Sequence, residues 1–225
     1  GSGVVPIVLD WRRIRGSESL SSVANVSLNG KILANPPVTT GGSDTRGTFE
    51  ESNEHLIFRD GVVTGENVIT LDFTSPILTS GSAITRYVDK EDGAEYIYSL
   101  FVPSDASTAF PVFDQPDLKA RFTLEMVGPA DWKSVANEGA KCENYQSVKT
   151  SAVRSELKTP RSGIPPELKL VLNSPEFAAA VKECALNTAD LTHSFAAFPE
   201  TKPISTYVFA FAAGPWAQVS EPGAV

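Results

Sequence analysis

The sequence predicts a mainly β protein folded as a β-sandwich. Its first 130 residues contain many short segments in which apolar and polar side chains alternate, the period expected of half-buried strands. Gly, Asn and Asp punctuate these segments at short intervals, as in sandwiches built from many short strands. A helical pattern is confined to residues 158–187. A chain of 225 residues fits one large domain.

Two tight hairpins are predicted near the amino end. Residues 27–33 (SLNGKIL) place Asn29-Gly30 between apolar positions, and residues 55–63 (HLIFRDGVV) repeat this pattern with Asp60-Gly61. Both dipeptides favour two-residue turns, because such turns need positive φ at their central residues. We therefore expect one antiparallel hairpin around each pair.

Four further strands are indicated by alternation, over residues 67–73, 95–102, 120–126 and 205–214. The segment 95–102 is largely apolar on both faces, so we expect it to be an inner strand of its sheet. In the other three, the positions expected to face inward are Ile69, Leu71 and Phe73, then Phe122, Leu124 and Met126, and then Tyr207, Phe209 and Phe211.

The helical pattern near the carboxyl end predicts an insertion in the sandwich. Ser174 is a typical N-cap, Pro175 a typical first helical residue, and Phe177 starts an apolar stripe. We expect a partly helical insertion over 139–187 that packs on the edge of the sandwich. The alternative is a helix that binds a partner.

Charge and hydropathy restrict the classes of partner. The formal net charge of −8 argues against nucleic acid or an anionic membrane as a partner. The basic cluster WRRIR at residues 11–15 is small, and we expect it to be a solvated strand or turn. No apolar run approaches the roughly 20 residues needed to cross a bilayer. The amino terminus lacks the features of a signal peptide, which leaves the compartment open.

Two cysteines, Cys142 and Cys184, are too few and too far apart in sequence for a zinc-ribbon pattern. They are either two free thiols or one disulfide. A disulfide would favour a periplasmic or secreted protein over a cytoplasmic one, because such bonds persist in oxidising compartments.

No catalytic or metal site follows from the residues alone. His55 and His193 have no neighbours at metal-ligand spacing, and the H-E-x-x-H and G-x-S-x-G motifs are missing. Asp105, Asp114 and Asp117 could supply the carboxylate pair of a glycoside hydrolase. Asp105 follows Pro-Ser and Asp117 follows Gln-Pro, positions where Asp usually caps a turn, so we expect these aspartates to be turn caps instead.

Residues 98–126 carry an ordered set of motifs. They are Asp105-Ala106, Phe110-Pro111, Asp114-Gln115-Pro116 and Lys119-Ala120. This set resembles the D-A-R, Phe-Pro, Asp-[Glu/Gln]-Pro and Lys-Ala steps in the amino-terminal domain of the aminopeptidase N family of zinc metallopeptidases. Residues 86–99 are similar to the preceding region of bacterial members, and 129–138 and 200–216 resemble segments that follow.

The resemblance implies that residues 1–225 form a saddle-like β-sandwich of antiparallel or mixed strands. This domain would wall the substrate cleft and support a separate catalytic domain. Its partners would be that catalytic domain and the peptide substrate. Zn would be bound by that catalytic domain, whose H-E-x-x-H motif is absent from these 225 residues. The full enzyme would remove amino-terminal residues from peptides, and this chain would contribute no catalytic residue and no cofactor.

The resemblance also places Ser99, Leu100, Phe101 and Val102 beside the amino end of the substrate, although a plain buried strand is the alternative. In the family, a polar side chain at the position of Val102 helps to hold the substrate amine, and Ser107 stands where D-A-R has Arg. Phe110 and Phe113 are expected to plug the connector between two strands. Other functions remain open: a free-standing module that binds peptide or carbohydrate, or a scaffold homologue without peptidase activity.

Overall fold

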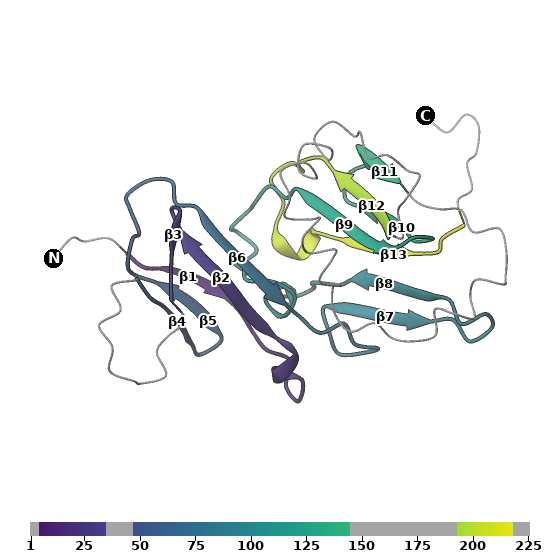
Figure 1. The fold of residues 1–225 in the computed structure, drawn as a ribbon, viewed down its shortest axis with the longest axis horizontal. Coiled ribbons are helices and arrows are strands. Elements are labelled where there is room, and N and C mark those ends of the chain that lie inside the picture. The colour runs from purple at the N-terminus through teal and green to yellow at the C-terminus, as the bar shows by residue number, and fades with distance from the viewer. Residues whose placement is uncertain (1–4, 35–46, 145–192, 218–225) are drawn as a thin grey trace. The chain divides into compact units, whose positions relative to one another are not determined.

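The computed structural model describes residues 5–34, 47–144 and 193–217 (Figure 1). Regular structure in these residues consists of β-strands and three short 3-10 turns, which confirms the mainly β prediction. The strand pairs within β1-β5-β4, β3-β2-β6 and β11-β12-β9, and the pair β10-β13, are antiparallel, and parallel contacts occur at the isolated bridges Ala34–Thr48 and Leu78–Thr85. Most of the predicted insertion 139–187, including Cys184, lies outside the described residues.

The chain divides into two compact units that share no simple boundary. The first unit comprises Gly1–Tyr87, Ile97–Ala120 and Pro203–Ala210. The second comprises Val88–Tyr96, Arg121–Lys202 and Phe211–Val225. Each unit is therefore assembled from segments that lie far apart in the sequence.

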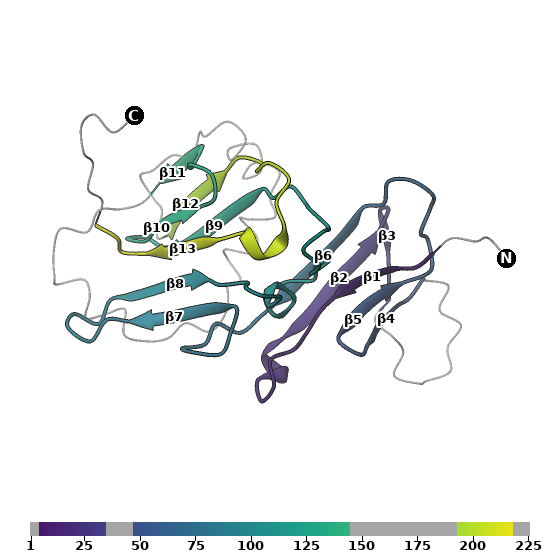
Figure 2. The same cartoon turned by 180° about the vertical axis from the view of Figure 1, so that it is seen from behind.

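Two three-stranded sheets form the body of the first unit, and Figures 1 and 2 show them from opposite sides. Their orders are β1 (Ile7–Asp10), β5 (His55–Phe58) and β4 (Phe49–Ser52), and then β3 (Lys31–Ile32), β2 (Ser22–Leu28) and β6 (Ile69–Thr74). In each sheet the central strand pairs on both sides. The pairing of β6 with β2 confirms the strand predicted at 67–73.

One apolar cluster joins these two sheets. Leu28 of β2 and Leu56 and Phe58 of β5 are fully buried in it, together with Trp11, which follows β1. Full burial of a large apolar side chain contributes about 1.5–3 kcal/mol relative to exposure. A core shared by two sheets is the arrangement of a β-sandwich, as the sequence predicts.

The first predicted hairpin is confirmed and the second is wrong. Asn29 and Gly30 have φ of 51° and 77° and connect β2 to β3. Asp60-Gly61 forms a turn, but β5 before it pairs with β1 and β4 rather than with the chain that follows. The second hairpin instead joins β4 to β5 through Asn53 and Glu54, whose φ values are 51° and 65°.

The second unit contains a sheet of order β11 (Cys142–Asn144), β12 (His193–Phe198) and β9 (Leu124–Pro129). β9 begins four residues later than the predicted strand at 120–126, but its alternation is as expected: Leu124 and Met126 are partly buried and Glu125 is exposed.

The predicted strand at 205–214 is too long. Thr206–Val208 forms a 3-10 turn, and β13 covers Phe211–Gly214, where it pairs with β10 (Lys133–Ala136). Tyr207 is 41% exposed, whereas Phe209 is 6% exposed, so these two side chains do not share one buried face.

β8 (Glu95–Ser99) lies between β13 and β7 (Ile84–Val88) in sheet order, so the predicted inner strand is confirmed, although it ends at Ser99 rather than at 102. Its Tyr96 ring packs against Trp216, with 4.5 Å between ring centroids. The same ring covers Gly214, where an added Cβ would lie 2.3 Å from the ring. Only glycine allows this close approach of the tyrosine ring to the backbone.

Candidate functional site

The segment that carries the family-like motifs leaves β8 and is here named the connector (residues 100–120). Its first anchor is Phe101, which is 1% exposed. The Phe110 ring packs edge-on against the Phe101 ring, with 5.5 Å between ring centroids. The Phe209 ring stacks on the Phe101 ring at 6.1 Å between centroids. Phe110 is partly buried in this aromatic cluster, and its role as a plug stays a prediction. Phe113 is 44% exposed, so its predicted role as a second plug is wrong.

The two neighbours of Phe101 point the other way. Leu100 is 57% exposed and Val102 is 53% exposed, whereas Phe101 between them is turned into the core. Ser99 is the last residue of β8, and the Leu100 N–H donates to the Ala83 carbonyl at 2.8 Å. Of the four residues predicted beside a substrate, Leu100 and Val102 thus offer an exposed apolar surface, and Phe101 does not.

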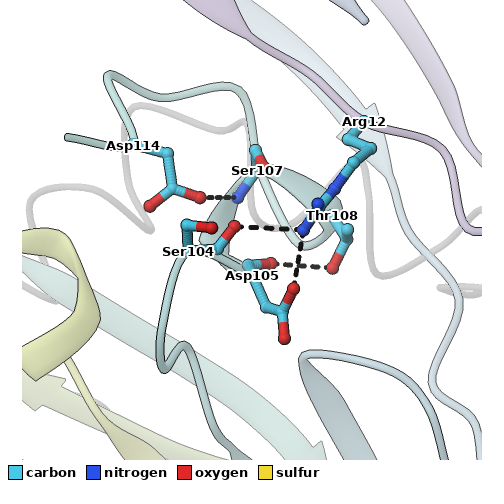
Figure 3. A network of polar contacts seen from close by, with 6 residues as sticks. All are labelled: Arg12, Ser104, Asp105, Ser107, Thr108 and Asp114. Atoms are coloured by element: carbon cyan, nitrogen blue, oxygen red, sulfur yellow. Dashed lines mark hydrogen bonds and ion pairs between the residues drawn. The ribbon is translucent and has the colours of Figure 1, made fainter.

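Arg12 binds the connector just beyond Val102 (Figure 3). Its Nη2 lies 2.6 Å from Asp105 Oδ1 and donates to the Ser104 carbonyl at 3.0 Å. Asp105 begins the 3-10 turn Ala106–Thr108, but its carboxylate makes no capping bond to that turn. The predicted capping role of Asp105 is therefore replaced by an ion pair with Arg12.

Asp114 performs the capping that the sequence assigns to it, but on a distant turn. Its Oδ2 accepts from the Ser107 N–H at 2.9 Å, inside the first turn of Ala106–Thr108 (Figure 3). Its own N–H donates to Asp10 Oδ2 at 2.9 Å. Asp114 consequently links the 3-10 turn to the end of β1.

The last residue of β1, Asp10, and the residue two positions later, Arg12, form backbone hydrogen bonds with the connector. Asp10 and Val112 exchange two backbone hydrogen bonds, of 2.7 and 3.1 Å. The Arg12 N–H donates to the Ser107 carbonyl at 2.9 Å. Trp11, between Asp10 and Arg12 in the sequence, is 1% exposed, which corrects the expectation that residues 11–15 form a solvated strand or turn.

The later half of the connector is held by residues from the carboxyl end of the chain. Ser205 donates from its hydroxyl to the Pro116 carbonyl, Thr206 donates to the Phe113 carbonyl at 3.2 Å, and Ala120 pairs with Ile204. The remaining motif residues Gln115, Asp117 and Lys119 are exposed, whereas Pro111 is partly buried. Asp117 lies in an exposed turn closed by the Leu118 N–H on the Gln115 carbonyl.

The described residues offer no donor set for a metal ion. No group of three or more His, Cys, Asp or Glu side chains comes together in residues 5–34, 47–144 and 193–217. His55 lies with Nε2 3.3 Å from Asp10 Oδ1, across the β1–β5 pair. The described part of the chain therefore does not fit a zinc site. It also contains no helix long and apolar enough to span a membrane.

Asp10 and Arg12 are the site residues that the sequence analysis missed. They flank Trp11 at positions i and i+2, so a buried Trp11 places both polar side chains on the opposite face of the extended chain. That alternation was the available signal. Their partners lie 93 and 104 residues further on, and such a separation leaves no local pattern in the sequence.

The connector falls within the part of the chain that matches a known protein family. Residues 15–157, more than half of the chain, match the sequence model of the peptidase M1 N-terminal domain. All the motif residues of the connector lie inside this match, as do Ser104 and Asp105, which Arg12 binds.

Several curated proteins are similar over the same part of the chain. Aminopeptidase N of Streptomyces lividans is 31% identical over 116 residues, which is 52% of this chain and 12% of that protein. A probable M1 family aminopeptidase of Encephalitozoon cuniculi is 33% identical over 86 residues, 38% of this chain and 10% of that protein. Glutamyl aminopeptidase of Sus scrofa is 30% identical over 91 residues, 39% of this chain and 9% of that protein. The chain thus matches about a tenth of the length of these relatives.

Proposed function

This chain belongs to the peptidase M1 N-terminal domain family, and from this premise we propose that it is the non-catalytic amino-terminal domain of a zinc-dependent aminopeptidase. In this proposal the domain walls one side of the substrate cleft and supports a catalytic domain that lies further along the same polypeptide. The zinc ion and the general base belong to that catalytic domain. Peptides with a free amino terminus are the substrates of the whole enzyme.

The family match over residues 15–157 is the observation that carries this proposal. One feature of the chain supports it. The exposed Leu100 and Val102 stand at the start of a connector fixed by hydrogen bonds and by an aromatic cluster, which suits a rigid wall rather than a reacting group.

The test compares two polypeptides, the 225-residue chain and the longer product of its own reading frame. We expect an H-E-x-x-H motif in the longer product, one bound zinc per molecule by elemental analysis, and hydrolysis of aminoacyl-anilides that a chelator abolishes. We expect the 225-residue chain to show neither zinc nor hydrolysis.

Two results contradict the proposal. A longer product with no H-E-x-x-H motif and no hydrolysis would mean that the chain is not part of an active peptidase. Stoichiometric zinc in the 225-residue chain would mean that the metal site lies within this domain.

A further inference from the structure

We propose that Arg12 is a positioning residue, which holds the exposed pair Leu100 and Val102 in place through Asp105 and the Ser104 carbonyl. We call the contacts of the Arg12 guanidinium with the Asp105 carboxylate and the Ser104 carbonyl the brace, and all three residues belong to the first unit. Its effect on a substrate rests on the proposed function, because it requires that Leu100 and Val102 line a substrate cleft.

Val102 lies between two anchors. On its amino side, Phe101 is fixed in the core by the rings of Phe110 and Phe209. On its carboxyl side, Ser104 and Asp105 are bound by the Arg12 guanidinium. A side chain that is 53% exposed has few contacts of its own to fix it, so the two anchors determine where it stands.

Arg12 can act as an anchor because its own backbone is fixed. Its N–H donates to the Ser107 carbonyl at 2.9 Å, and it follows Trp11, which is buried in the core of the sandwich. The guanidinium therefore extends from a rigid strand end, and Figure 3 shows it reaching the Ser104 carbonyl and the Asp105 carboxylate together. An arginine suits this role, because its planar donors are already oriented before they bind.

The brace orders the connector locally and contributes little to the stability of the whole fold. The side chains of Arg12 and Asp105 are 35% and 46% exposed, and water screens ion pairs at such sites. Loss of the pair should leave the global unfolding transition almost unchanged. It should loosen the turn that Asp105 begins, where the N–H groups of Asp105 and Thr108 bond to Phe101 and Asp105 carbonyls.

Hydrogen exchange on the 225-residue chain tests the brace. In Arg12→Met, and independently in Asp105→Asn, we expect the amides of Asp105 and Thr108 to exchange about two- to fivefold faster, the factor that a half-exposed ion pair is worth. Arg13→Met is the matched control, because Arg13 pairs with Glu51 at 2.6 Å and side-chain exposures of 37% and 32%, but on β4 rather than on the connector.

A charge exchange tests the pair directly. The double variant Arg12→Asp with Asp105→Arg should restore part of the slow exchange, and Arg12→Lys should lie between Arg12→Met and wild type. If Arg12→Met and Arg13→Met leave the Asp105 and Thr108 amides equally protected, the brace does not exist.

Kinetics of the longer polypeptide test the effect on substrate. We expect Arg12→Met to raise KM for an aminoacyl-anilide by a similar two- to fivefold with kcat little changed, and Arg13→Met to leave both constants unaltered. Faster exchange with unchanged KM would overturn the positioning role while leaving the brace intact. A wild-type polypeptide without peptidase activity would refute the proposed function, and the exchange data would still decide whether the brace exists.

Discussion

Phe101 determines at the level of a single residue which side chains the connector exposes. It is enclosed by Phe110 and Phe209, and the rings pack edge-on and stacked, the two arrangements that aromatic pairs favour. Its neighbours Leu100 and Val102 are more than half exposed, so Phe101 is the buried anchor of this short segment. Conservative changes at Leu100 and Val102 are therefore tolerated by the fold, and changes at Phe101 are not.

Replacing Phe101 by alanine should lower the free energy of unfolding by about 3–5 kcal/mol, since the change removes a buried ring and leaves a cavity. Val102→Ala is the control and should change stability by less than about 0.5 kcal/mol, as is usual at exposed positions. Urea unfolding followed by circular dichroism measures both values. Equal losses for the two variants would show that Phe101 is not an anchor.

Turn geometry decides, at the level of elements, which strands become neighbours. Asn29-Gly30 and Asn53-Glu54 each place two residues at positive φ and connect paired strands, whereas Asp60-Gly61 has positive φ at Gly61 and leads out of its sheet. A turn dipeptide therefore indicates that the chain reverses, but the next strand pairs only if its apolar face meets a core. β6 meets such a core beside β2, in the other sheet of the first unit.

Gly30→Val should destabilise the protein by at least about 1–2 kcal/mol, because a side chain at φ of 77° is strained in the left-handed region. Gly139→Ala serves as the control: its added Cβ would meet no atom within 4 Å, and its φ is not positive. The melting temperature of each variant checks the expectation. Equal melting temperatures for the Gly30→Val and Gly139→Ala variants would argue against a positive-φ requirement at the β2–β3 turn.

The sequence was sufficient for local elements and insufficient for their partners. Alternation located β6, β8 and β9, and the Asn-Gly pair located the β2–β3 hairpin. The predicted strands extend past the end of β8 and start before β13, because the adjoining residues are also apolar although they lie outside these strands. For the connector, the sequence indicated Phe110 and a capping role for Asp114. The ion pair of Arg12 with Asp105 required the fold, since nothing local relates residues this far apart.

The whole molecule is not a series of contiguous pieces. Residues Pro203–Ala210 belong to the first unit, although they follow the second unit's β12 in sequence. They supply Phe209 to the aromatic cluster, and Ser205 and Thr206 to the connector. The first unit is therefore incomplete when the chain is cut after Ala120.

A chain shortened to residues 5–120 should consequently lose cooperative thermal unfolding, because it lacks the ring that stacks on Phe101. A chain that ends at residue 217 retains all of these contacts and should melt close to the full chain. Calorimetry of the two fragments provides the comparison. Cooperative melting of 5–120 near the temperature of the full chain would show that Pro203–Ala210 is dispensable.

The late position of Phe209 also has a consequence for biosynthesis. While the ribosome is still translating residues 121–209, the emerged amino-terminal half has Phe101 and Phe110 but not the ring that covers them. At about 5–20 residues per second, this interval lasts on the order of ten seconds. During that time the nascent chain presents an uncovered aromatic surface. This surface is of the kind that chaperones at the ribosome exit bind, so we expect the first unit to complete its folding only after Phe209 has emerged.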